Sequence, residues 1–171
     1  MKLSSEQLKS LFKNYNYNPL TGDVSSKLGH VYCSTERGYP VHVVKIAGKK
    51  TRILLHRMIV AAHIEESIDD LDVDHINGVR DDNRFSNLRA VNRSNNRRNS
   101  AKPRNNVSGV VGVCWHKHQR KWEVKLLNKT IGYSRDFFEA CCIRKSNENK
   151  AGGFTNRYGS ERVYVNSNDN V

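Results

Sequence analysis

Long apolar runs are absent from this sequence of 171 residues. A membrane-spanning helix needs about 18 or more consecutive apolar residues, so the pattern excludes one. The chain starts with MKLSSEQLKSLF, which has the spacing of an amphipathic helix and not the apolar stretch of a secretory signal. We therefore expect a cytoplasmic protein with no membrane partner.

Cysteine is scarce, and the four cysteines do not form a metal-binding pattern. Cys33 and Cys114 stand alone, and Cys141 and Cys142 are adjacent, so no pair has the spacing of a zinc knuckle. Neighbouring cysteines rarely bond each other, because their Cα atoms are too close for relaxed disulfide geometry. We expect four reduced, mostly structural thiols and no structural zinc.

Acidic residues are few, with 17 Asp and Glu against 29 Lys and Arg, which gives a formal charge of +12. Such an excess favours a polyanionic partner, because each phosphate contact releases counterions and adds affinity. The apolar fraction is modest at 37%, which favours small modules with exposed surface between them. The charge alone leaves open a basic protein that is merely soluble.

Apolar residues recur at helical spacing near the start of the chain and alternate with polar ones further on. Val41, Val43 and Lys45 fall on one side of an expected strand, and the residues between them fall on the other. The expected elements are a helix over 4–12 capped by Ser5, a strand between turns over 15–29, a hairpin over 38–56 that turns at Gly48, and a helix over 54–64.

An acidic segment follows, with eight of the 17 acids between Glu65 and Asp82. Within it the pattern changes to short alternating stretches around an Asn-Gly turn, which favours strands over a helix. The predicted order is a strand over 73–78 that ends in the turn, a returning strand over 87–91, and a short helix through Asn99 capped by Asn92 or Ser94.

A basic stretch then leads to a second module. From Asn92 to Lys125 there are nine Lys and Arg and one acid. Residues 101–106 lack apolar periodicity, which is typical of a linker. We expect an α+β protein with domains at 1–100 and 107–158, the linker 101–106 between them and a tail over 159–171. In the second domain we expect strands over 110–116, 121–127 and 129–135. A helix over 136–152 is expected to start near Asp136 and to stop at Gly152.

Asp74, His75 and Asn96 together have the chemistry to cut a phosphodiester bond. The reaction needs an activated water, neutralisation of developing charge and help for the leaving 3′ oxygen. A neutral imidazole accepts a proton from water near pH 7. A carboxylate and an amide carbonyl are hard oxygen ligands that suit Mg²⁺ or Mn²⁺. We therefore expect one divalent ion on Asp74 and Asn96 and a general base at His75.

The adjacency of Asp74 and His75 constrains the backbone around them. Neighbouring side chains of a strand point to opposite faces, so these two converge only where the strand ends or twists. The Asn77-Gly78 turn just afterwards is consistent with such an end. Asn87, between the loop and the returning strand, is expected to hydrogen-bond backbone carbonyls and to fix the His75 loop.

The stretch DVDHINGVRDDNRFSNLRAVNRSNNRRN resembles the HNH, or ββα-metal, motif of phage homing endonucleases through DHxNG, S-N-L-R and N-x-x-N-N-x-x-N. The resemblance implies His75 and Asn87 as catalytic residues, the first as general base and the second in a structural role. It implies that Asn96 binds the metal with Asp74; many members carry His at this third position, and Asn favours Mg²⁺ or Mn²⁺. The implied activity is a homing-type DNA endonuclease, in the host cytoplasm if phage-encoded, whose products carry 5′-phosphate and 3′-hydroxyl ends.

Two further parts of the chain extend the resemblance. YNPLTGDV and GYPVHVVKIAGKKTRILLHRMIVAAHI are similar to the N-terminal part common in this family. SGVVGVCWHKHQRKWEVKLLNKTIGYSRDFFEACCIRKSNENKAG resembles the plant ethylene-response-factor, or Apetala-type, DNA-binding domain. That resemblance implies a three-stranded antiparallel sheet packed on a helix, with the sheet reading the major groove of duplex DNA. Where many plant members carry arginine, this chain has Val111, Cys114 and His116.

The metal ligands and the role of the nearby acids have alternatives. Asp81 and Asp82 are either extra ligands or, as we favour, part of a solvated loop, because a second ion would need more carboxylates at the same point. Asn96 has close neighbours that could take its place as ligand. These neighbours are Asn92, Asn95 and Asn99.

Four aromatic side chains also have alternatives. His56 is either a catalyst or, as we favour, a hydrogen-bonded residue at the edge of the core. His63 lies on the apolar face of its helix and is expected to be structural. Trp115 and Trp122 are expected in the core of the second module rather than stacked on bases.

Basic residues around and after the motif are expected to contact DNA rather than to form an ordinary solvated surface. They are Arg57, Arg93, Arg97, Arg98, Lys102, Arg104, His116, Lys117, Arg120, Lys121 and Lys125. One ββα unit gives one active site, so a monomer nicks, and cutting both strands takes a weak dimer or two successive events. Two other functions stay open: a sequence-specific regulator with a vestigial nuclease unit, and an RNA-binding protein.

Overall fold

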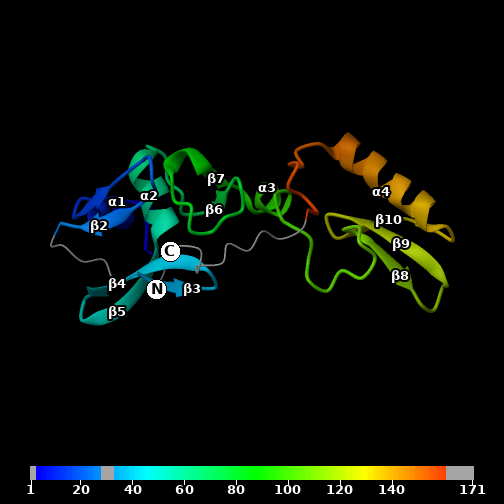
Figure 1. Cartoon of the computed structure of the whole chain (residues 1–171), viewed down its shortest axis with the longest axis horizontal. Helices are drawn as coiled ribbons and strands as arrows, with labels where there is room; N and C mark the ends of the chain where they lie inside the picture. The colour runs from blue at the N-terminus through cyan, green and yellow to red at the C-terminus, as the bar shows by residue number, and fades with distance from the viewer. Residues whose placement is uncertain (1–2, 28–32, 161–171) are drawn as a thin grey trace, which may run out of the picture. The chain divides into compact units, whose positions relative to one another are not determined.

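The computed structural model of the chain describes residues 3–27 and 33–160 (Figure 1). It divides into two compact units, an N-terminal unit that ends at Asn96 and a C-terminal unit that begins at Arg97. Both mix helices with small antiparallel sheets, so the expected α+β class is confirmed. No helix within the described ranges is long and apolar enough to cross a membrane.

The first helix, α1 (Ser5–Phe12), is capped by Ser4, one residue before the expected cap. The Ser4 hydroxyl accepts from the Gln7 backbone N–H, and the Gln7 side chain accepts from the Ser4 N–H, which completes a capping box. The expected cap, Ser5, was wrong, because its hydroxyl donates to the Asp69 carboxylate at 2.8 Å instead. The helix start is thereby fixed to the acidic segment.

A short hairpin of β1 (Tyr15–Tyr17) and β2 (Val24–Ser26) follows α1. Its turn contains Gly22 at φ +82°, a conformation that side chains rarely adopt. A Cβ at this position would lie 2.6 Å from the backbone nitrogen of Arg84. The hairpin therefore lies so close to the backbone of Arg84 that only glycine fits at position 22.

A three-stranded sheet has the order β3 (Cys33–Glu36), β4 (Tyr39–Ile46) and β5 (Lys49–Leu54). The expected hairpin is confirmed, and its turn has positive φ at Ala47 and Gly48, as a type I′ turn requires. Strand β3 was not expected from the sequence. The face of β4 that carries Val44 and Ile46 packs on the core, and the opposite face is exposed at Val43 and Lys45 but buried at Val41.

Helix α2 (Leu55–His63) is the centre of the N-terminal core. Met58 and Ile59 have no exposed surface, and Ile68 just beyond the helix is equally buried. Helix α1 packs on α2, and α2 packs on the sheet and on the strands that follow. The buried helix thus connects the sheet to the segment that carries the Asp-His pair.

The expected β–loop–β–α unit is confirmed as β6 (Asp72–His75), a 3₁₀ turn η1 (Phe85–Asn87), β7 (Leu88–Val91) and α3 (Arg93–Arg97). The Asn95 backbone N–H donates to the Asn92 side chain at 2.8 Å, so Asn92 caps α3. The helix ends at Arg97, two residues short of the expected end, because the chain from Arg97 onward packs in the other unit.

The C-terminal unit has the antiparallel order β10 (Lys129–Ser134), β9 (Lys121–Leu126) and β8 (Val113–His116), with α4 (Phe137–Ala151) packed on it. The expected three-stranded sheet and helix are therefore confirmed. Helix α4 begins and ends where expected: the Asp136 carboxylate caps it by accepting from Glu139 N–H at 2.7 Å, and it stops at Gly152. Its small core consists of Val113, Val124 and Ala140.

A buried arginine holds this small unit together. Arg144 is 1% exposed; its Nε donates to the Val111 carbonyl at 3.0 Å, and a terminal nitrogen pairs with Glu148 at 3.0 Å. The other terminal nitrogen donates to the Tyr158 hydroxyl at 2.9 Å. Nε and one terminal nitrogen are hydrogen-bonded, and the other terminal nitrogen is ion-paired with Glu148 without a hydrogen bond to a described residue. The ion pair and the two hydrogen bonds let the charge be tolerated in the core.

The segment expected as a linker is bonded to the C-terminal unit, since the Lys102 N–H donates to the Ser160 carbonyl at 2.9 Å. Asn99, just before that segment, is fully buried in the same unit and accepts from the Thr155 hydroxyl at 2.7 Å. The compact division consequently falls before residue 100. Most of the expected tail, residues 161–171, lies outside the described residues.

Two side-chain expectations for the C-terminal unit are borne out only in part. Trp115 is 46% exposed, whereas Trp122 is half-buried and packs on Phe137 with ring centroids 4.6 Å apart. The thiols of Cys114 and Cys142 are free and exposed, so neither is a core residue. Cys141 is free and packs on the core as expected, and the side chain of Cys33 lies outside the described residues.

Candidate active site

His75 is the last residue of β6 and is only 3% exposed. Its Nε2 lies 3.3 Å from the amide oxygen of Asn83, and its ring centroid lies 5.0 Å from that of His56 and 5.8 Å from that of Tyr39. Burial lowers the pKa of the His75 imidazole, and the Asn83 hydrogen bond opposes this. The imidazole is therefore neutral at pH 7, as a general base must be.

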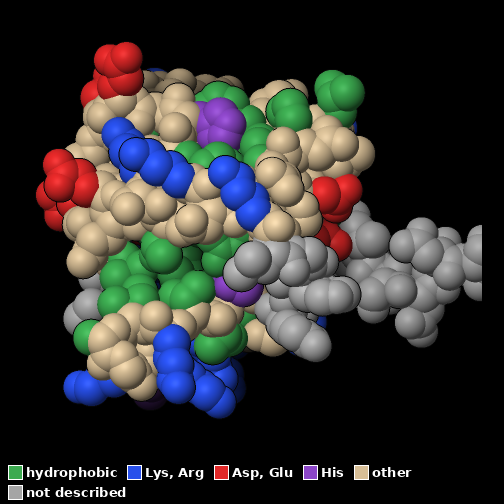
Figure 2. Space-filling model, turned by 90° about the vertical axis from the view of Figure 1, so that its left-hand side faces the viewer, with side chains coloured by type: hydrophobic (Ala, Val, Ile, Leu, Met, Phe, Trp, Pro, Cys, Tyr) green, Lys and Arg blue, Asp and Glu red, His purple; other side chains and the backbone are tan. Residues whose placement is uncertain are grey.

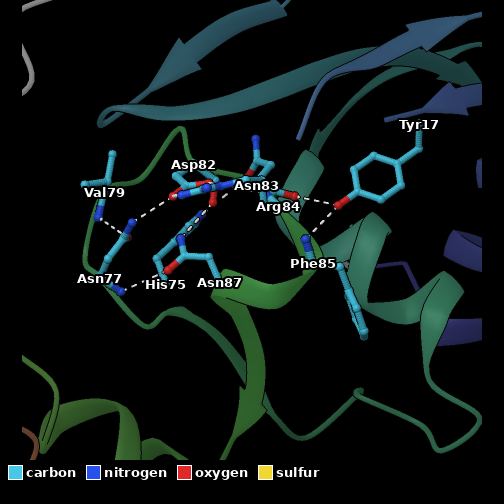
Figure 3. Close-up of polar contacts among 9 residues, drawn as sticks. All are labelled: Tyr17, His75, Asn77, Val79, Asp82, Asn83, Arg84, Phe85 and Asn87. Atoms are coloured by element: carbon cyan, nitrogen blue, oxygen red, sulfur yellow. Dashed lines mark hydrogen bonds and ion pairs between the residues drawn. The ribbon is translucent and has the colours of Figure 1, made fainter. Parts of the chain in front are cut away.

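The loop after β6 curls around His75 and is tied together by side chains (Figure 3). The Asn87 side-chain oxygen accepts from the Asn77 N–H at 3.0 Å, and its nitrogen donates to the Asp82 carbonyl at 2.9 Å. Asn77 donates to the Asp82 carboxylate at 2.7 Å. Asn87 thus bonds one backbone carbonyl and one backbone N–H, and both bonds fix the loop that carries His75.

Asp74 lies next to His75 and is 9% exposed. Its Oδ2 accepts two hydrogen bonds from Arg89, directly opposite on β7, at 2.9 and 3.2 Å. Alternation along β6 puts Asp72 on the same face as Asp74. The two aspartates and Arg89 therefore form a charged row on one face of this two-stranded sheet.

Asn96 approaches that face from α3. Its side-chain nitrogen donates to Asp72 Oδ2 at 3.0 Å, which turns the amide oxygen away from Asp72. The donor chemistry of Asp74 and Asn96, a carboxylate and an oriented amide oxygen, fits a small hard cation such as Mg²⁺ or Mn²⁺. Within the described part of the chain, no group of three or more His, Cys, Asp or Glu could hold an ion. Asp74 and Asn96 are not such a group, because they are two residues and one of them is an asparagine.

His56 is buried beside His75 and differs from the expected hydrogen-bonded residue. It is 4% exposed, and its Nδ1 has no hydrogen-bond partner among the described residues. Burial, the neighbouring His75 ring and the charge of Arg57 lower the pKa of His56 to about 3. A second neutral imidazole thus lines the wall behind the candidate base.

The other residues with alternatives have clear contacts. His63 Nδ1 lies 2.8 Å from the Ile59 carbonyl, and its exposed ring stacks on Phe85 with centroids 4.8 Å apart. Asp82 pairs with Arg84 at 2.6 Å, which with other hydrogen bonds lowers the pKa of that carboxyl to about 2. Asp81 is exposed. These contacts agree with a structural His63 and with a loop role for the two acids.

Two of the expected DNA contacts belong to the N-terminal unit. Arg57 is half-buried, and its guanidinium donates to the Leu71 and Ile68 carbonyls at 2.7 and 3.0 Å. Its charge therefore supports the segment before β6. Arg93 is exposed at the start of α3.

The remaining expected contacts lie in the C-terminal unit. Arg97 donates to Asn128 at 2.9 Å, and the Arg98 guanidinium lies over the Phe154 ring at 5.4 Å. Lys125 pairs with Glu123 at 2.9 Å on the sheet face opposite to the core. The others are at least partly exposed: Lys102, Arg104, His116, Lys117, Arg120 and Lys121.

Sequence reasoning missed a basic face on the N-terminal sheet. Lys45 pairs with Lys50 and Val43 with Arg52, so these side chains share the face of β4 and β5 that is turned away from the core. All are exposed, and Figure 2 shows Lys and Arg side chains gathered at the lower edge of this unit, where β5 lies. The alternation of residues along the two strands of this hairpin could have predicted that Lys45, Lys50 and Arg52 share one face.

It also missed Asn83 and Tyr39, which lie against the candidate base. Asn83 is 4% exposed, and the Tyr39 ring lies between the imidazoles and the Arg80 guanidinium, which is 4.8 Å from its centroid. Arg80 also donates to the Arg37 carbonyl, which ties the β3–β4 turn to the loop after β6. No local pattern marks these residues, since their contacts join distant parts of the chain.

Comparison with known proteins gives one family match. Residues 54–98 match the family model of the HNH endonuclease, and this segment contains Asp74, His75, Asn87 and Asn96. The expected resemblance is thereby confirmed for the nuclease segment. It is not confirmed for the ethylene-response-factor type of domain, which stays a prediction.

The comparisons with individual proteins are more limited. A search of curated proteins found none that is similar. Among solved structures, one described as "DNA binding and cleavage by the HNH homing endonuclease I-HmuI" is 30% identical, with a TM-score of 0.40. The match covers 47% of this chain and 48% of that one, so the chain spans about half the length of that protein.

Proposed function

We propose that this protein is a homing-type HNH endonuclease that hydrolyses phosphodiester bonds in duplex DNA with one divalent metal ion. The observation that carries the proposal is that the HNH family match over residues 54–98 coincides with the unit in which Asp74 and His75 end a strand beside the Asn87-bound loop. The formal charge of +12 supports a polyanionic substrate.

His75 acts as the general base. Its neutral imidazole takes a proton from a water molecule, and the resulting hydroxide attacks the phosphorus. The bond between phosphorus and O3′ breaks, which leaves a 5′-phosphate on one side and a 3′ oxygen that takes up a proton on the other. The buried position of His75 supports this role, because burial keeps the imidazole neutral.

Asp74 and Asn96 hold the metal ion, which is Mg²⁺ or Mn²⁺. When bound, the ion supplies positive charge for the phosphate and the leaving oxygen. Asp72 orients the Asn96 amide, and Arg89 shares the Asp74 carboxylate. Asn87 keeps the loop in place through its two backbone hydrogen bonds.

The domain 107–158, which is the larger part of the C-terminal unit, binds the DNA target. The outer face of its sheet carries His116, Lys121 and Lys125, and the turn between β8 and β9 adds Lys117 and Arg120. These side chains provide phosphate contacts, which position a protein on DNA. The basic residues from Arg93 to Arg104 extend the contacts. With one active site per chain, a monomer nicks one strand.

A plasmid-nicking assay with Mg²⁺ or Mn²⁺, and with EDTA as control, tests the activity. His75→Ala should abolish nicking and leave binding to duplex DNA within a few-fold. Asn96→Ala should raise the metal concentration needed for half-maximal nicking. Loss of both nicking and binding in His75→Ala would make this histidine architectural, and an unchanged metal titration would remove Asn96 from the metal site.

A second candidate is a sequence-specific regulator whose nuclease unit is vestigial. It is favoured by the occupied Asp74 carboxylate, which already pairs with the cation Arg89, and by the low exposure of His75. The same assay separates the two functions. Tight binding to one DNA sequence without nicking in either metal would establish the regulator.

A further inference from the structure

We propose that Asn83 is a positioning residue that fixes the tautomer of His75, and that the β1–β2 hairpin holds Asn83 in place. The catalytic meaning of this proposal rests on the proposed nuclease function. Its structural content does not, because it concerns which ring nitrogen carries the proton in the neutral imidazole.

The hydrogen bond between the two side chains decides the tautomer. The amide oxygen of Asn83 only accepts, and it lies 3.3 Å from His75 Nε2. A neutral imidazole has one N–H, so a bond to this oxygen places the hydrogen on Nε2. Nδ1 then keeps its lone pair and is the nitrogen that accepts the proton of water.

Burial makes this bond decisive. Asn83 is 4% exposed and His75 is 3% exposed, so water does not compete for Nε2. A buried N–H without an acceptor costs about 1–3 kcal/mol, which is enough to bias a tautomer equilibrium strongly. The rings of His56 and Tyr39 pack on His75 with centroids at 5.0 and 5.8 Å, the first edge to face and the second tilted.

The backbone of Asn83 is fixed from the hairpin. The Tyr17 hydroxyl, at the end of β1, donates to the Asn83 carbonyl at 3.0 Å and accepts from the Phe85 N–H at 2.7 Å (Figure 3). Both functions of one phenol are thus used on the same short stretch of chain. Burial raises the pKa of Tyr17, so the phenol keeps the proton that it donates.

The other side of the hairpin packs directly on the same stretch. A Cβ on Gly22 would lie 2.8 Å from the Asn83 carbonyl carbon and 2.6 Å from the Arg84 nitrogen. From within the loop, Asn87 holds the Asp82 carbonyl at 2.9 Å. The backbone from Asp82 to Phe85 is therefore held on both sides, which leaves the Asn83 side chain little freedom to turn away from His75.

The direct test is the tautomer of His75 in the full chain. The protein is labelled with ¹⁵N in histidine, and two-bond correlations between ring protons and nitrogens are recorded at pH 7.5. His75→Gln identifies the His75 signals by their loss. We expect the Nε2–H tautomer for His75. A dominant Nδ1–H tautomer, or a freely exchanging mixture, would overturn the proposal.

Variants of Asn83 separate positioning from a merely structural role. Asn83→Leu removes the acceptor at similar volume and should shift His75 away from pure Nε2–H. It should lower kcat by about 10- to 100-fold, the usual effect of losing an orienting partner, and leave KM within a few-fold. Asn83→Asp restores an acceptor oxygen and should restore the Nε2–H tautomer. If Asn83→Asp and Asn83→Leu give the same tautomer, Asn83 does not set it.

Variants of the hairpin test the second half of the proposal. Tyr17→Phe removes both hydrogen bonds and should give a mixed His75 tautomer with a smaller loss of kcat than Asn83→Leu. Tyr15→Phe removes the same atom from the same strand, where the ring packs on His42 at 5.2 Å, and serves as the control. An unchanged tautomer in Tyr17→Phe would show that the hairpin does not position Asn83.

The two proposals fail in different ways. A wild-type protein that nicks no DNA in Mg²⁺ or Mn²⁺ contradicts the nuclease function, and the tautomer of His75 is still measurable in that protein. A nicking enzyme with an Nδ1–H His75 contradicts the role of Asn83 and leaves the nuclease function intact. Should Asn83→Leu not fold, the wild-type spectrum and Asn83→Asp still decide.

Discussion

His56 and His75 lie side by side, and burial keeps both imidazoles neutral in the folded protein. For His56 the effect is large, because its protonation would bury a charge next to a second imidazole and near Arg57. A candidate base needs a neutral ring, and a neutral neighbour adds no charge that would repel a cation nearby. His56, which was expected at the edge of the core, therefore lines the candidate active site.

We predict that His56 makes the N-terminal unit sensitive to acid. The folded pKa is about 3 and an ordinary histidine has about 6.5, so between these values the unfolded chain binds a proton that the folded chain excludes. Stability is thus complete above pH 6.5 and falls as the pH drops towards 3, by up to about 1.4 kcal/mol per pH unit from this group. Urea unfolding at pH 7 and pH 5 measures the difference.

His56→Phe should flatten this dependence, and His118→Ala, at an exposed histidine, should keep the wild-type dependence. Both tryptophans lie in the C-terminal unit, so tryptophan fluorescence would not report on unfolding of the N-terminal unit. Unfolding is therefore best followed by hydrogen exchange of the α2 amides. An unchanged pH dependence in His56→Phe would contradict the prediction.

At the scale of elements, the β1–β2 hairpin and the β4–β5 hairpin use their glycines differently. Gly22 and Gly48 both have positive φ, at +82° and +78°. Only Gly22 faces a backbone within 3 Å, whereas a Cβ on Gly48 would meet nothing within 4 Å. The first glycine lets one hairpin pack on the loop of the site, and the second only closes a turn.

We predict that Gly22→Ala destabilises the N-terminal unit more than Gly48→Ala does. Gly48→Ala should cost about 1 kcal/mol from the positive φ alone. Gly22→Ala adds a clash with the Arg84 backbone and should cost roughly 2–4 kcal/mol in total. Hydrogen exchange of the N-terminal unit measures both. Equal losses would mean that the hairpin yields without strain.

The exposed face of β4 and β5 gives a prediction about DNA affinity. Replacing Lys45, Lys50 and Arg52 by alanine should weaken binding uniformly across sequences and reduce the salt dependence of log K by about 1 for each lost phosphate contact. The control is Lys13→Ala, at an exposed lysine after α1, which should leave the slope unchanged. A triple variant with the wild-type slope would remove this face from the DNA interface.

For the whole molecule, the division into two units predicts a separation of cutting from targeting. Deleting residues from 101 onward should leave weak nicking with poor preference for any site, because it removes the sheet and helix proposed to bind DNA. Cut positions on a labelled duplex, mapped strand by strand, measure the preference. A truncated protein that cuts the same positions with the same preference as the full chain would show that the C-terminal unit does not select the target site.

Much of this organisation was predictable, because local rules govern it. The Asp-His pair before an Asn-Gly turn indicated the end of a strand, and Asp136 and Gly152 marked the ends of a helix. Adjacent serines show the limit of such rules. Ser4 caps α1 because Ser5 is bonded to Asp69, 64 residues away, and nothing in the local sequence distinguishes them.

The least predictable features are polar residues in the core. Arginine is usually a surface residue, yet Arg144 is buried because several distant groups converge on its guanidinium. Asn83 lies 3.3 Å from His75, and its backbone carbonyl accepts a hydrogen bond from Tyr17, 66 residues earlier. Such contacts depend on the completed packing and have no periodicity that a sequence could display.

The free thiols of the C-terminal unit have a practical consequence. Cys114 is on the sheet face that carries Lys125 and Glu123, with its sulfur 3.7 Å from the Glu123 carboxylate, whereas Cys142 is on α4. A duplex with a disulfide tethered to one base can be captured by either cysteine, because the cysteine thiolate attacks that disulfide, joins the tether as a mixed disulfide and releases the other half as a thiol. Cys114 and Cys142, the two exposed thiols among the described residues, are therefore chemical reporters on either side of the sheet that register which side a nucleic acid approaches.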